Sequence, residues 1–438
     1  TVKDLPTPPR SLGLMACLAL VVGNMIGSGV FVLPANLAPY GWSATGGWII
    51  TISGTMCLAG CFALLSRAFP QAGGPYVYVE QAFGRPAAFV VAWSYWIGLW
   101  VGNGALAVAA MSNLSALVPA IGTVPGLGAA LAVGVVALFT ATNLAGARTG
   151  SLIAQVTTVL KLLPLIAVLV IAVVLLARDG QAAVVGPPLT LDAGAMITSV
   201  TLTLWAMLGF ESATLPADKV RNPARTIPLA TLWGTGLTGL IYMAISTAML
   251  ALVPAGSLAQ SSAPFADFVR PFVGDGAAVA VALFAAIAAL GAMNGWVMVA
   301  GEVPRAMAGG GVFPAYFGRV NGRGVPAAAL VINGVLTGAL VLTNYARSLV
   351  SLFEFILLIS TTAMLVAYLA VALSLLLLKG RGLALGGGIS VAVGLAGAAY
   401  AGFAIYAAGR EAIGWGALLL LGGVPVLAIM RRRRQWTS

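Results

Sequence analysis

The chain has 438 residues, of which 60% are hydrophobic and only 8% are charged, and its net charge at pH 7 is +11. Soluble domains carry about 25% charged residues, so this composition excludes a soluble globular protein. A membrane-spanning helix needs about 20 apolar residues, and the length therefore allows about a dozen spans joined by short loops. We expect one all-α integral membrane domain.

Twelve apolar runs, separated by glycine, proline and charged residues, predict twelve membrane-spanning helices. The first run follows Arg10 and is longer than the apolar part of a signal peptide, so we expect it to be retained. The predicted spans are residues 11–35, 42–66, 86–118, 124–144, 150–177, 194–215, 226–252, 274–304, 325–344, 349–378, 385–407 and 412–430.

Basic residues are distributed unequally between the two sides of these spans. With a cytoplasmic N-terminus, seventeen Lys and Arg residues fall in inside segments, four fall in outside segments, and Lys161 falls within a span, which accounts for all 22. Cytoplasmic loops are enriched in Lys and Arg, so both termini are predicted to be cytoplasmic. We expect the run Arg431 to Arg434 to contact lipid headgroups and not nucleic acid.

Spans one and six carry matching interruptions. The first contains Gly23-Asn24-Met25-Ile26-Gly27-Ser28-Gly29, and the sixth contains Trp205-Ala206-Met207-Leu208-Gly209-Phe210-Glu211. An offset of five spans reverses the orientation of the second unit and predicts an inverted repeat with a binding site near the midplane. For the glycines of span one, close helix packing is the alternative interpretation.

These breaks divide the chain into predicted units. The two repeats are residues 11–177 and 194–378, which together form a ten-helix core over 11–378. Residues 385–430 add two peripheral spans. The segments 1–10 and 431–438 are predicted to be cytoplasmic.

Several kinds of chemistry have no support in the sequence. Histidine is absent, which removes serine–histidine triads and histidine metal sites. None of the four lysines follows a glycine, so there is no phosphate-binding GxxxxGK[ST] loop. We therefore expect neither an enzyme nor a bound cofactor or metal, and secondary transport remains.

The breaks also suggest a ligand. A half-helix N-terminus exposes N–H groups, and a C-terminal end exposes carbonyls. N–H groups of the run Gly27-Ser28-Gly29 would bind a carboxylate, and carbonyls near Met25, Trp205 and Leu208 would bind an ammonium group. The predicted ligand is an amino acid.

At this point the sequence resembles a known family. The run Asn24 to Phe31, followed by Leu33 to Leu37, is similar to the first span of the amino acid, polyamine and organocation transporters. The further matches are Gly73-Gly74-Pro75-Tyr76, Tyr95-Trp96, Leu204-Trp205, Gly209 to Ser212, Asn222-Pro223 and Ile227-Pro228. The chain looks most similar to the basic amino acid and polyamine antiporters, above all the arginine/agmatine exchangers. This implies a LeuT-type fold working by alternating access in a bacterial inner membrane.

The resemblance also implies roles for individual residues. Trp296 would be the aromatic platform for a guanidinium, since a Trp face attracts a cation by about 0.5 to 2 kcal/mol; simple packing between helices is the alternative. Trp205 would be the lid over the substrate. Asn103 and Ser360 match positions at the distal end of the substrate, Asn24 matches a position beside the carboxylate, and Tyr76, Tyr95 and Tyr368 match gates.

The remaining predicted pocket residues are Met25, Ile26, Gly27, Ser28, Gly29, Gly98, Leu99, Leu106, Leu208 and Gly209. Among them, Gly98, Leu99 and Leu106 stand where the arginine/agmatine exchangers carry other residues. Ornithine, lysine, a polyamine or a neutral amino acid are therefore alternatives to arginine.

Lys161 is predicted to lie deep in the membrane. It follows the predicted cytoplasmic edge near residue 150 by eleven residues, about 16 Å of helix. A lysine there costs on the order of 2.5 to 3.5 kcal/mol, so we expect it to face the carbonyls of the broken first span. The resemblance implies that it stands where sodium-coupled relatives hold sodium; a purely structural lysine is the alternative.

Three glutamates complete the set of candidate residues. The resemblance places Glu211 at a position implicated in pH response, and a helix-capping carboxylate is the alternative. Glu302 and Glu354 are expected to be solvated end charges or partners of Arg305 and Arg347.

We therefore expect exchange of an arginine-like cationic amino acid for a related amine, with proton-coupled or facilitative transport of neutral amino acids as the alternative. The partners are a small amino acid or amine and the lipid bilayer, and not nucleic acid. The oligomeric state stays open, with a homodimer as one option.

Overall fold

The computed structural model describes residues 12–27, 29–71, 73–145, 160–215, 217 and 220–432. Within these ranges the protein is all-helical, and its one pairing of the strand type is an isolated bridge between Leu12 and Val220. Ten of the described helices are long and apolar enough to cross a membrane, or eleven if one bent pair forms a single span. The prediction of an all-α membrane protein is confirmed.

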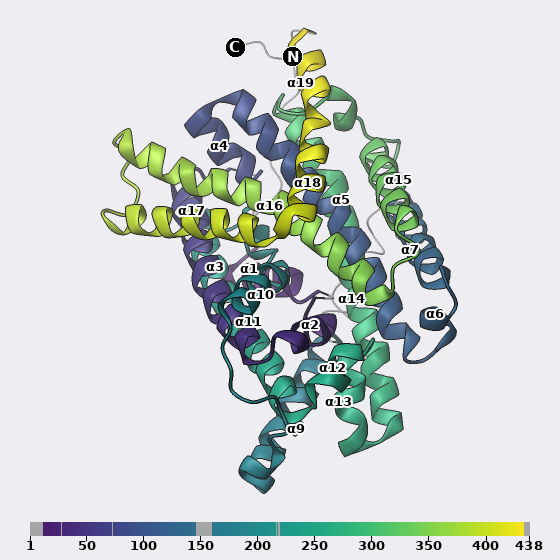
Figure 1. Ribbon diagram of the computed structural model, residues 1–438. Coiled ribbons are helices and arrows are strands. Elements are labelled where there is room, and N and C mark those ends of the chain that lie inside the picture. Colours follow the sequence, from purple (N-terminus) through teal and green to yellow (C-terminus); the bar gives the residue numbers. More distant parts are fainter. Residues whose placement is uncertain are drawn as a thin grey trace.

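The elements follow one another along the chain as mostly long helices with short ones between them (Figure 1). They are α1 (Leu14–Met25), α2 (Gly29–Leu37), η1 (Ala38–Tyr40), α3 (Trp42–Ala68), α4 (Pro75–Phe83), α5 (Arg85–Ser115), α6 (Ala120–Thr123), α7 (Leu127–Leu144), α9 (Leu162–Asp179), η2 (Gly180–Ala183), α10 (Ala193–Ala206), η3 (Phe210–Thr214), α11 (Pro223–Leu252), α12 (Ala255–Gln260), α13 (Pro264–Val273), α14 (Asp275–Gly309), η5 (Ala315–Gly318), α15 (Ala327–Thr343), α16 (Leu349–Gly380), α17 (Ile389–Ala407), α18 (Gly409–Leu421) and α19 (Gly423–Arg432).

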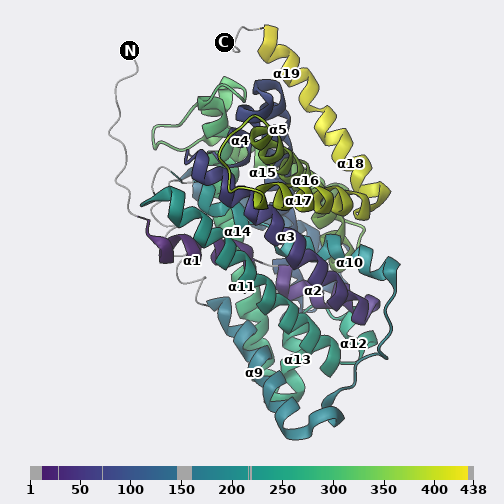
Figure 2. The same cartoon turned by 90° about the vertical axis from the view of Figure 1, so that its left-hand side faces the viewer.

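The long helices lie where the apolar runs predicted them. Two details differ: α15 has 17 residues and is shorter than the helices that meet the length criterion for a span, and the last predicted span consists of two helices that meet at Gly422 and Gly423. Residues 146–159, which include the start of the predicted fifth span, lie outside the described part. The hydropathy pattern did not predict the short helices α12 and α13, which lie at the end of the molecule opposite α4 and α19 (Figures 1 and 2).

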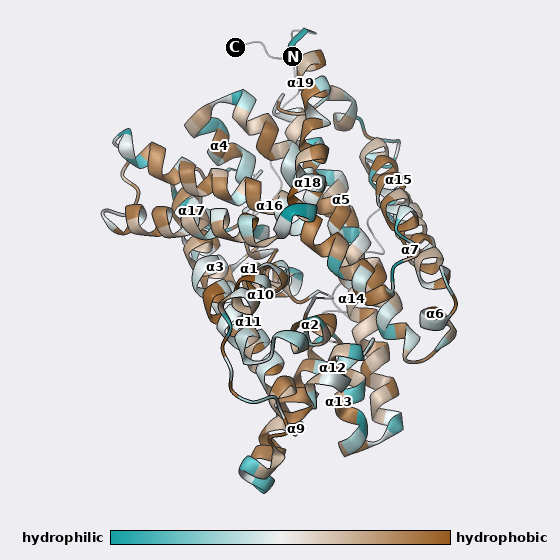
Figure 3. Cartoon of the chain, viewed as in Figure 1, coloured by the Kyte–Doolittle hydropathy of each residue, from teal (hydrophilic) through white to brown (hydrophobic). Residues whose placement is uncertain are grey.

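Many large apolar side chains of the described residues are exposed, as expected for a protein in lipid. Figure 3 shows hydrophobic residues along most helices and hydrophilic residues at the tips of α9 and α13. Burial differs strongly between helices: 89% of the apolar window of α5 is buried within the protein, against 17% for the α18–α19 segment. Helix α5 is therefore central, and α18 and α19 are peripheral.

Both predicted interruptions are present. Helix α1 ends at Met25 and α2 begins at Gly29, with a bend of 42° between them. Helix α10 ends at Ala206, and a turn through Gly209 leads into η3. Gly209 has a φ of 104°, and a side chain there would also lie 3.2 Å from the backbone of Asn24. Only glycine suits that conformation and contact, so the two breaks pack directly on each other.

Candidate functional site

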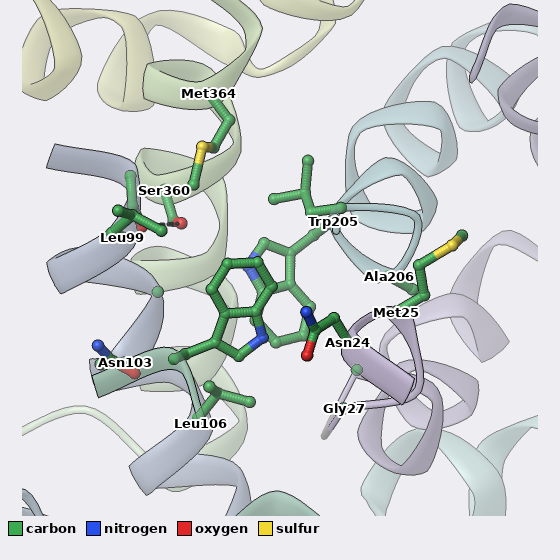
Figure 4. A pocket seen from close by; sticks show the side chains of 15 residues that line it. Asn24, Met25, Gly27, Leu99, Asn103, Leu106, Trp205, Ala206, Ser360 and Met364 are labelled. Carbon is green, nitrogen blue, oxygen red and sulfur yellow. Dashed lines mark hydrogen bonds between the residues drawn. The ribbon is translucent and has the colours of Figure 1, made fainter. Parts of the chain in front are cut away.

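A cavity lies where the two breaks face the continuous helices α5, α14 and α16 (Figure 4). It contains about 460 Å³ of empty space, a volume that includes space open to solvent. In Figure 4, Asn103 and Ser360 lie on one side of the cavity and Asn24 and Gly27 on the other. The lining residues are Asn24, Met25, Gly27, Gly29, Gly98, Leu99, Gly102, Asn103, Leu106, Trp205, Ala206, Leu208, Trp296, Ser360 and Met364.

Most of the predicted pocket residues therefore come together at one cavity. Ile26 does not line it, because its side chain is fully buried elsewhere. Gly209 packs on Asn24 instead of facing the cavity, and Ser28 lies outside the described residues. The analysis of the sequence missed Ala206, which follows Trp205 directly, and Gly102 and Met364, which lie one helical turn beyond Gly98 and Ser360. The helical period could have found the last two.

The end of α1 has fewer free carbonyls than the sequence suggested. The Met25 carbonyl accepts hydrogen bonds from the Tyr242 hydroxyl at 2.7 Å and from the Gly27 N–H at 2.8 Å. The Gly27 N–H is therefore engaged as well. The described N–H groups that remain without an intrahelical partner at this break are those of the first turn of α2, starting at Gly29.

Glu211 holds the break in span six together. Its carboxylate is fully buried; Oε1 accepts from the Tyr95 hydroxyl at 2.9 Å, and Oε2 accepts from the Gly209 N–H at 3.2 Å. The Trp205 carbonyl accepts from the Leu208 N–H at 3.1 Å. This break is thus closed on itself by local hydrogen bonds.

Two of the three predicted gate tyrosines meet beside Glu211. The Tyr368 ring packs against Phe210, with centroids 5.0 Å apart, and against Phe62 at 5.7 Å. Tyr95 reaches the same place through its bond to Glu211. Tyr76 lies apart from them, on α4, with its ring against Gly73 and its hydroxyl near Gly310.

Trp205 lies across the start of α2. Its ring meets Phe353 edge-on, with centroids 5.3 Å apart. A side chain at Gly29 would come within 2.7 Å of the indole, so this packing requires a glycine at that position. Trp296 is half-buried and contributes the second indole of the cavity.

Helices α5 and α16 form the wall of the cavity that lies opposite the break in span one, here called the distal wall. The Ser360 hydroxyl donates to the Gly98 carbonyl at 2.8 Å, and the Met364 side chain lies against Gly98. The side-chain oxygen of Asn103 is buried and has no hydrogen-bond partner among the described residues. None of the described residues that line the cavity is acidic. A cation here would meet an indole face and an amide oxygen, not a carboxylate.

Lys161 lies beside the cavity and not in it. Its side chain is buried, and the ammonium donates to the Gly23 carbonyl near the end of α1. We expected Lys161 to face the carbonyls of the broken first span, and this contact confirms that expectation. A helix C-terminus carries a partial negative charge, so the ammonium stabilises α1 where its own hydrogen bonds end.

Two ion pairs involve the charges at the helix ends. Arg305 pairs with Glu302 at 2.6 Å. Arg347 instead pairs with Glu411 at 3.0 Å and lies over the Phe355 ring. Of the two options expected for Glu354, a solvated end charge or a partner of Arg347, the ion pairs among the described residues do not include the second, and Glu354 is partly exposed.

Comparison of the sequence with known proteins shows the family of the chain. Residues 12–416 match the family model described as amino acid permease. The chain is 36% identical to the cadaverine/lysine antiporter of Escherichia coli K12 over 336 residues, 76% of this chain and 74% of the relative. It is 28% identical to the putrescine transporter of the same strain, covering 97% of both chains, and 29% identical to a putative arginine/ornithine antiporter of Bacillus subtilis, covering 83% of both.

Proposed function

The chain belongs to the amino acid permease family, a family of membrane transporters and not of enzymes, and we propose that it exchanges a cationic amino acid for a related amine by alternating access. The observation that carries the proposal is the cavity between two interrupted helices. It combines free helix-end N–H groups, an indole and an unpartnered amide oxygen. The named relatives, antiporters of lysine with cadaverine and of arginine with ornithine, support a cationic cargo.

The proposed architecture has twelve spans, with two inverted five-span repeats of the LeuT type and two peripheral spans. The matched breaks at α1–α2 and α10–η3 support the repeat. Ala327–Thr343 would be the twelfth span beside the eleven that meet the length criterion when the bent pair counts as one. The excess of basic residues in one set of loops supports cytoplasmic termini, and the bacterial relatives support the inner membrane.

The substrate's two ends would be bound by different parts of the cavity. The first turn of α2, from Gly29, would hold the carboxylate. Trp296 and Asn103 would hold the distal cation, with Trp205 as the lid. Glu211, Tyr95 and Tyr368 would form one gate, and Tyr76 would provide a further gate contact. Lys161, through its bond to the Gly23 carbonyl, would link the conformation of α1 to transport.

The distal wall favours a terminal ammonium over a guanidinium. A guanidinium presents five N–H donors in a plane, and an ammonium presents three. The wall offers two acceptors: the Asn103 side-chain oxygen, and the hydroxyl oxygen of Ser360, which donates its own proton to the Gly98 carbonyl. The other side chains of this wall are apolar, namely Leu99, Leu106 and Met364. Unmet donors in a buried site are costly, so we propose lysine, ornithine or a diamine ahead of arginine.

A neutral amino acid is the second candidate. The absence of an acidic residue among the described cavity residues and the three apolar side chains of the distal wall favour it. Competition by alanine or serine, but not by lysine or arginine, would select it.

Transport into proteoliposomes tests the proposal. Uptake of labelled lysine and arginine is compared between vesicles loaded with lysine, cadaverine or arginine and empty vesicles, at two pH values. We expect uptake into loaded vesicles only, with lysine exceeding arginine. No uptake of either cation, together with uptake of alanine or serine, would overturn cation exchange in favour of neutral transport.

A further inference from the structure

We propose that Asn333, on α15 and outside the cavity, is a positioning residue that fixes the separation of the two cavity walls carrying Asn103 and Trp296. The inference rests on the proposed function, because it assigns to these walls the recognition of the distal cation. Asn333 does not itself line the cavity.

The Asn333 side chain bridges two helices of the site. It is 5% exposed. Its amide oxygen accepts from the Trp96 indole N–H on α5 at 2.7 Å, and its amide nitrogen donates to the Ala300 carbonyl on α14, also at 2.7 Å. One planar group therefore ties α5 to α14.

A proline explains why the Ala300 carbonyl is available. In a regular helix this carbonyl accepts from the N–H four residues later. That residue is Pro304, inside α14, and proline has no N–H and crowds the carbonyl four residues before it. The Ala300 carbonyl would be buried without a partner, and the Asn333 amide supplies one.

The bridge lies close to both recognition groups along the helices. Ala300 follows Trp296 by four residues, about 6 Å of helix, and Trp96 precedes Asn103 by seven, about 10 Å. On the other side of Trp296, the Asn143 amide on α7 donates to the Asn294 side chain at 3.0 Å. The segment of α14 that carries Trp296 is thus held from both sides, and the Asn333 bridge is the one that leads to α5.

Helices α5 and α14 also pack directly on each other, so loss of the bridge would change their local spacing near Trp96 and Ala300 without separating the helices. A substrate whose cation contacts both Trp296 and Asn103 then loses one contact, and a shorter side chain loses it first. The measurable consequence is a change in the relative affinity for lysine and ornithine, which differ by one methylene. A purely structural role would lower the fraction of folded protein and leave this ratio unchanged.

The variants Asn333→Leu and Trp96→Phe test the bridge. Dissociation constants for lysine and ornithine are measured by calorimetry on monodisperse protein in detergent. We expect Asn333→Leu to weaken lysine binding about 10-fold and ornithine binding at least 3-fold more than that. Trp96→Phe keeps one aromatic ring at this position but removes the indole N–H, together with part of the packing against Phe313 and Phe317. It should shift the ratio in the same direction by less, which keeps the test valid if Asn333→Leu does not fold.

Two further variants separate positioning from stability. Thr337→Val removes a buried bond of similar length, from the Thr337 hydroxyl to the Trp100 carbonyl at 2.7 Å, which links α15 to α5 only; it should leave the ratio unchanged. Pro304→Ala, added to Asn333→Leu, returns an N–H partner to Ala300. It should restore thermal stability while the ratio stays shifted.

An unchanged lysine-to-ornithine ratio in both Asn333→Leu and Trp96→Phe would overturn the positioning role and leave cation exchange standing. A ratio restored by Pro304→Ala would also overturn it, since satisfaction of the carbonyl would then be sufficient. If the wild-type protein binds neither cation, the proposed function fails, and this inference fails with it.

Discussion

The cavity has two unlike halves. On one side the helices are interrupted at α1–α2 and α10–η3, and backbone groups face the cavity. On the other side α5 and α16 run unbroken for 31 and 32 residues, and the cavity is lined there by side chains and by two glycines of α5. The proposed function assigns them two tasks: helix ends would bind what every amino acid shares, its carboxylate and ammonium, and side chains would read what differs between amino acids. Changes on the continuous side should therefore alter selectivity, and changes on the interrupted side should affect all substrates alike.

The largest effect is expected for Trp296→Leu. Loss of a desolvated cation–π contact of about 2 kcal/mol weakens binding of a cationic side chain about 30-fold, while the affinity for norleucine, whose side chain has no charge, should change little. Titration in detergent measures both. Trp233→Leu is the matched control, because Trp233 is 69% exposed on the outer surface of α11 and far from the cavity lining. Equal losses for lysine and norleucine would contradict the division of tasks.

A smaller, unselective effect is expected for Gly29→Ala. The new methyl group would come within 2.7 Å of the Trp205 ring and displace it from the start of α2. We expect lysine, ornithine and norleucine all to bind about 10-fold more weakly, since the shared carboxylate site is disturbed. Gly295→Ala serves as the control, because a methyl group there meets nothing within 4 Å. If only lysine and ornithine bound more weakly and norleucine did not, Gly29 would act on selectivity, which contradicts its assignment to the shared half of the cavity.

The smallest effect on affinity is expected for Lys161→Ala. The Gly23 carbonyl loses its partner, but the cavity lining is unchanged. Binding should stay within about 3-fold of the wild type, whereas transport should fall about 10-fold or lose its pH dependence, because α1 is no longer held in one state. Paired binding and proteoliposome assays make the comparison. Normal transport with a normal pH profile would make Lys161 a structural residue only.

The general architecture and the centre of the site were predictable from the sequence because both depend on local patterns. Apolar runs identify spans whatever their neighbours, and paired glycine-rich interruptions mark breaks in the helix. Lys161 was also predictable, since a buried charge must find a polar partner and the broken helix supplies carbonyls at the same depth.

The remaining features depend on contacts between distant segments. The Met25 carbonyl is already engaged by Tyr242, which follows it by more than two hundred residues. The partner of Arg347 is Glu411, which the α17–α18 turn brings to it. The bond between Asn333 and the carbonyl freed by Pro304 joins two helices whose register the sequence does not reveal. The position of Pro304 could have drawn attention to Ala300, but not to its partner.

The most direct test of the central claim compares lysine with norleucine, which has the same carbon chain without the terminal ammonium. Their affinities for the wild-type protein are measured by calorimetry under identical conditions. The division of the cavity into a shared and a selective half, with Trp296 and Asn103 reading the cation, predicts that lysine binds at least 10-fold more tightly. Equal affinities, or tighter binding of norleucine, would contradict it.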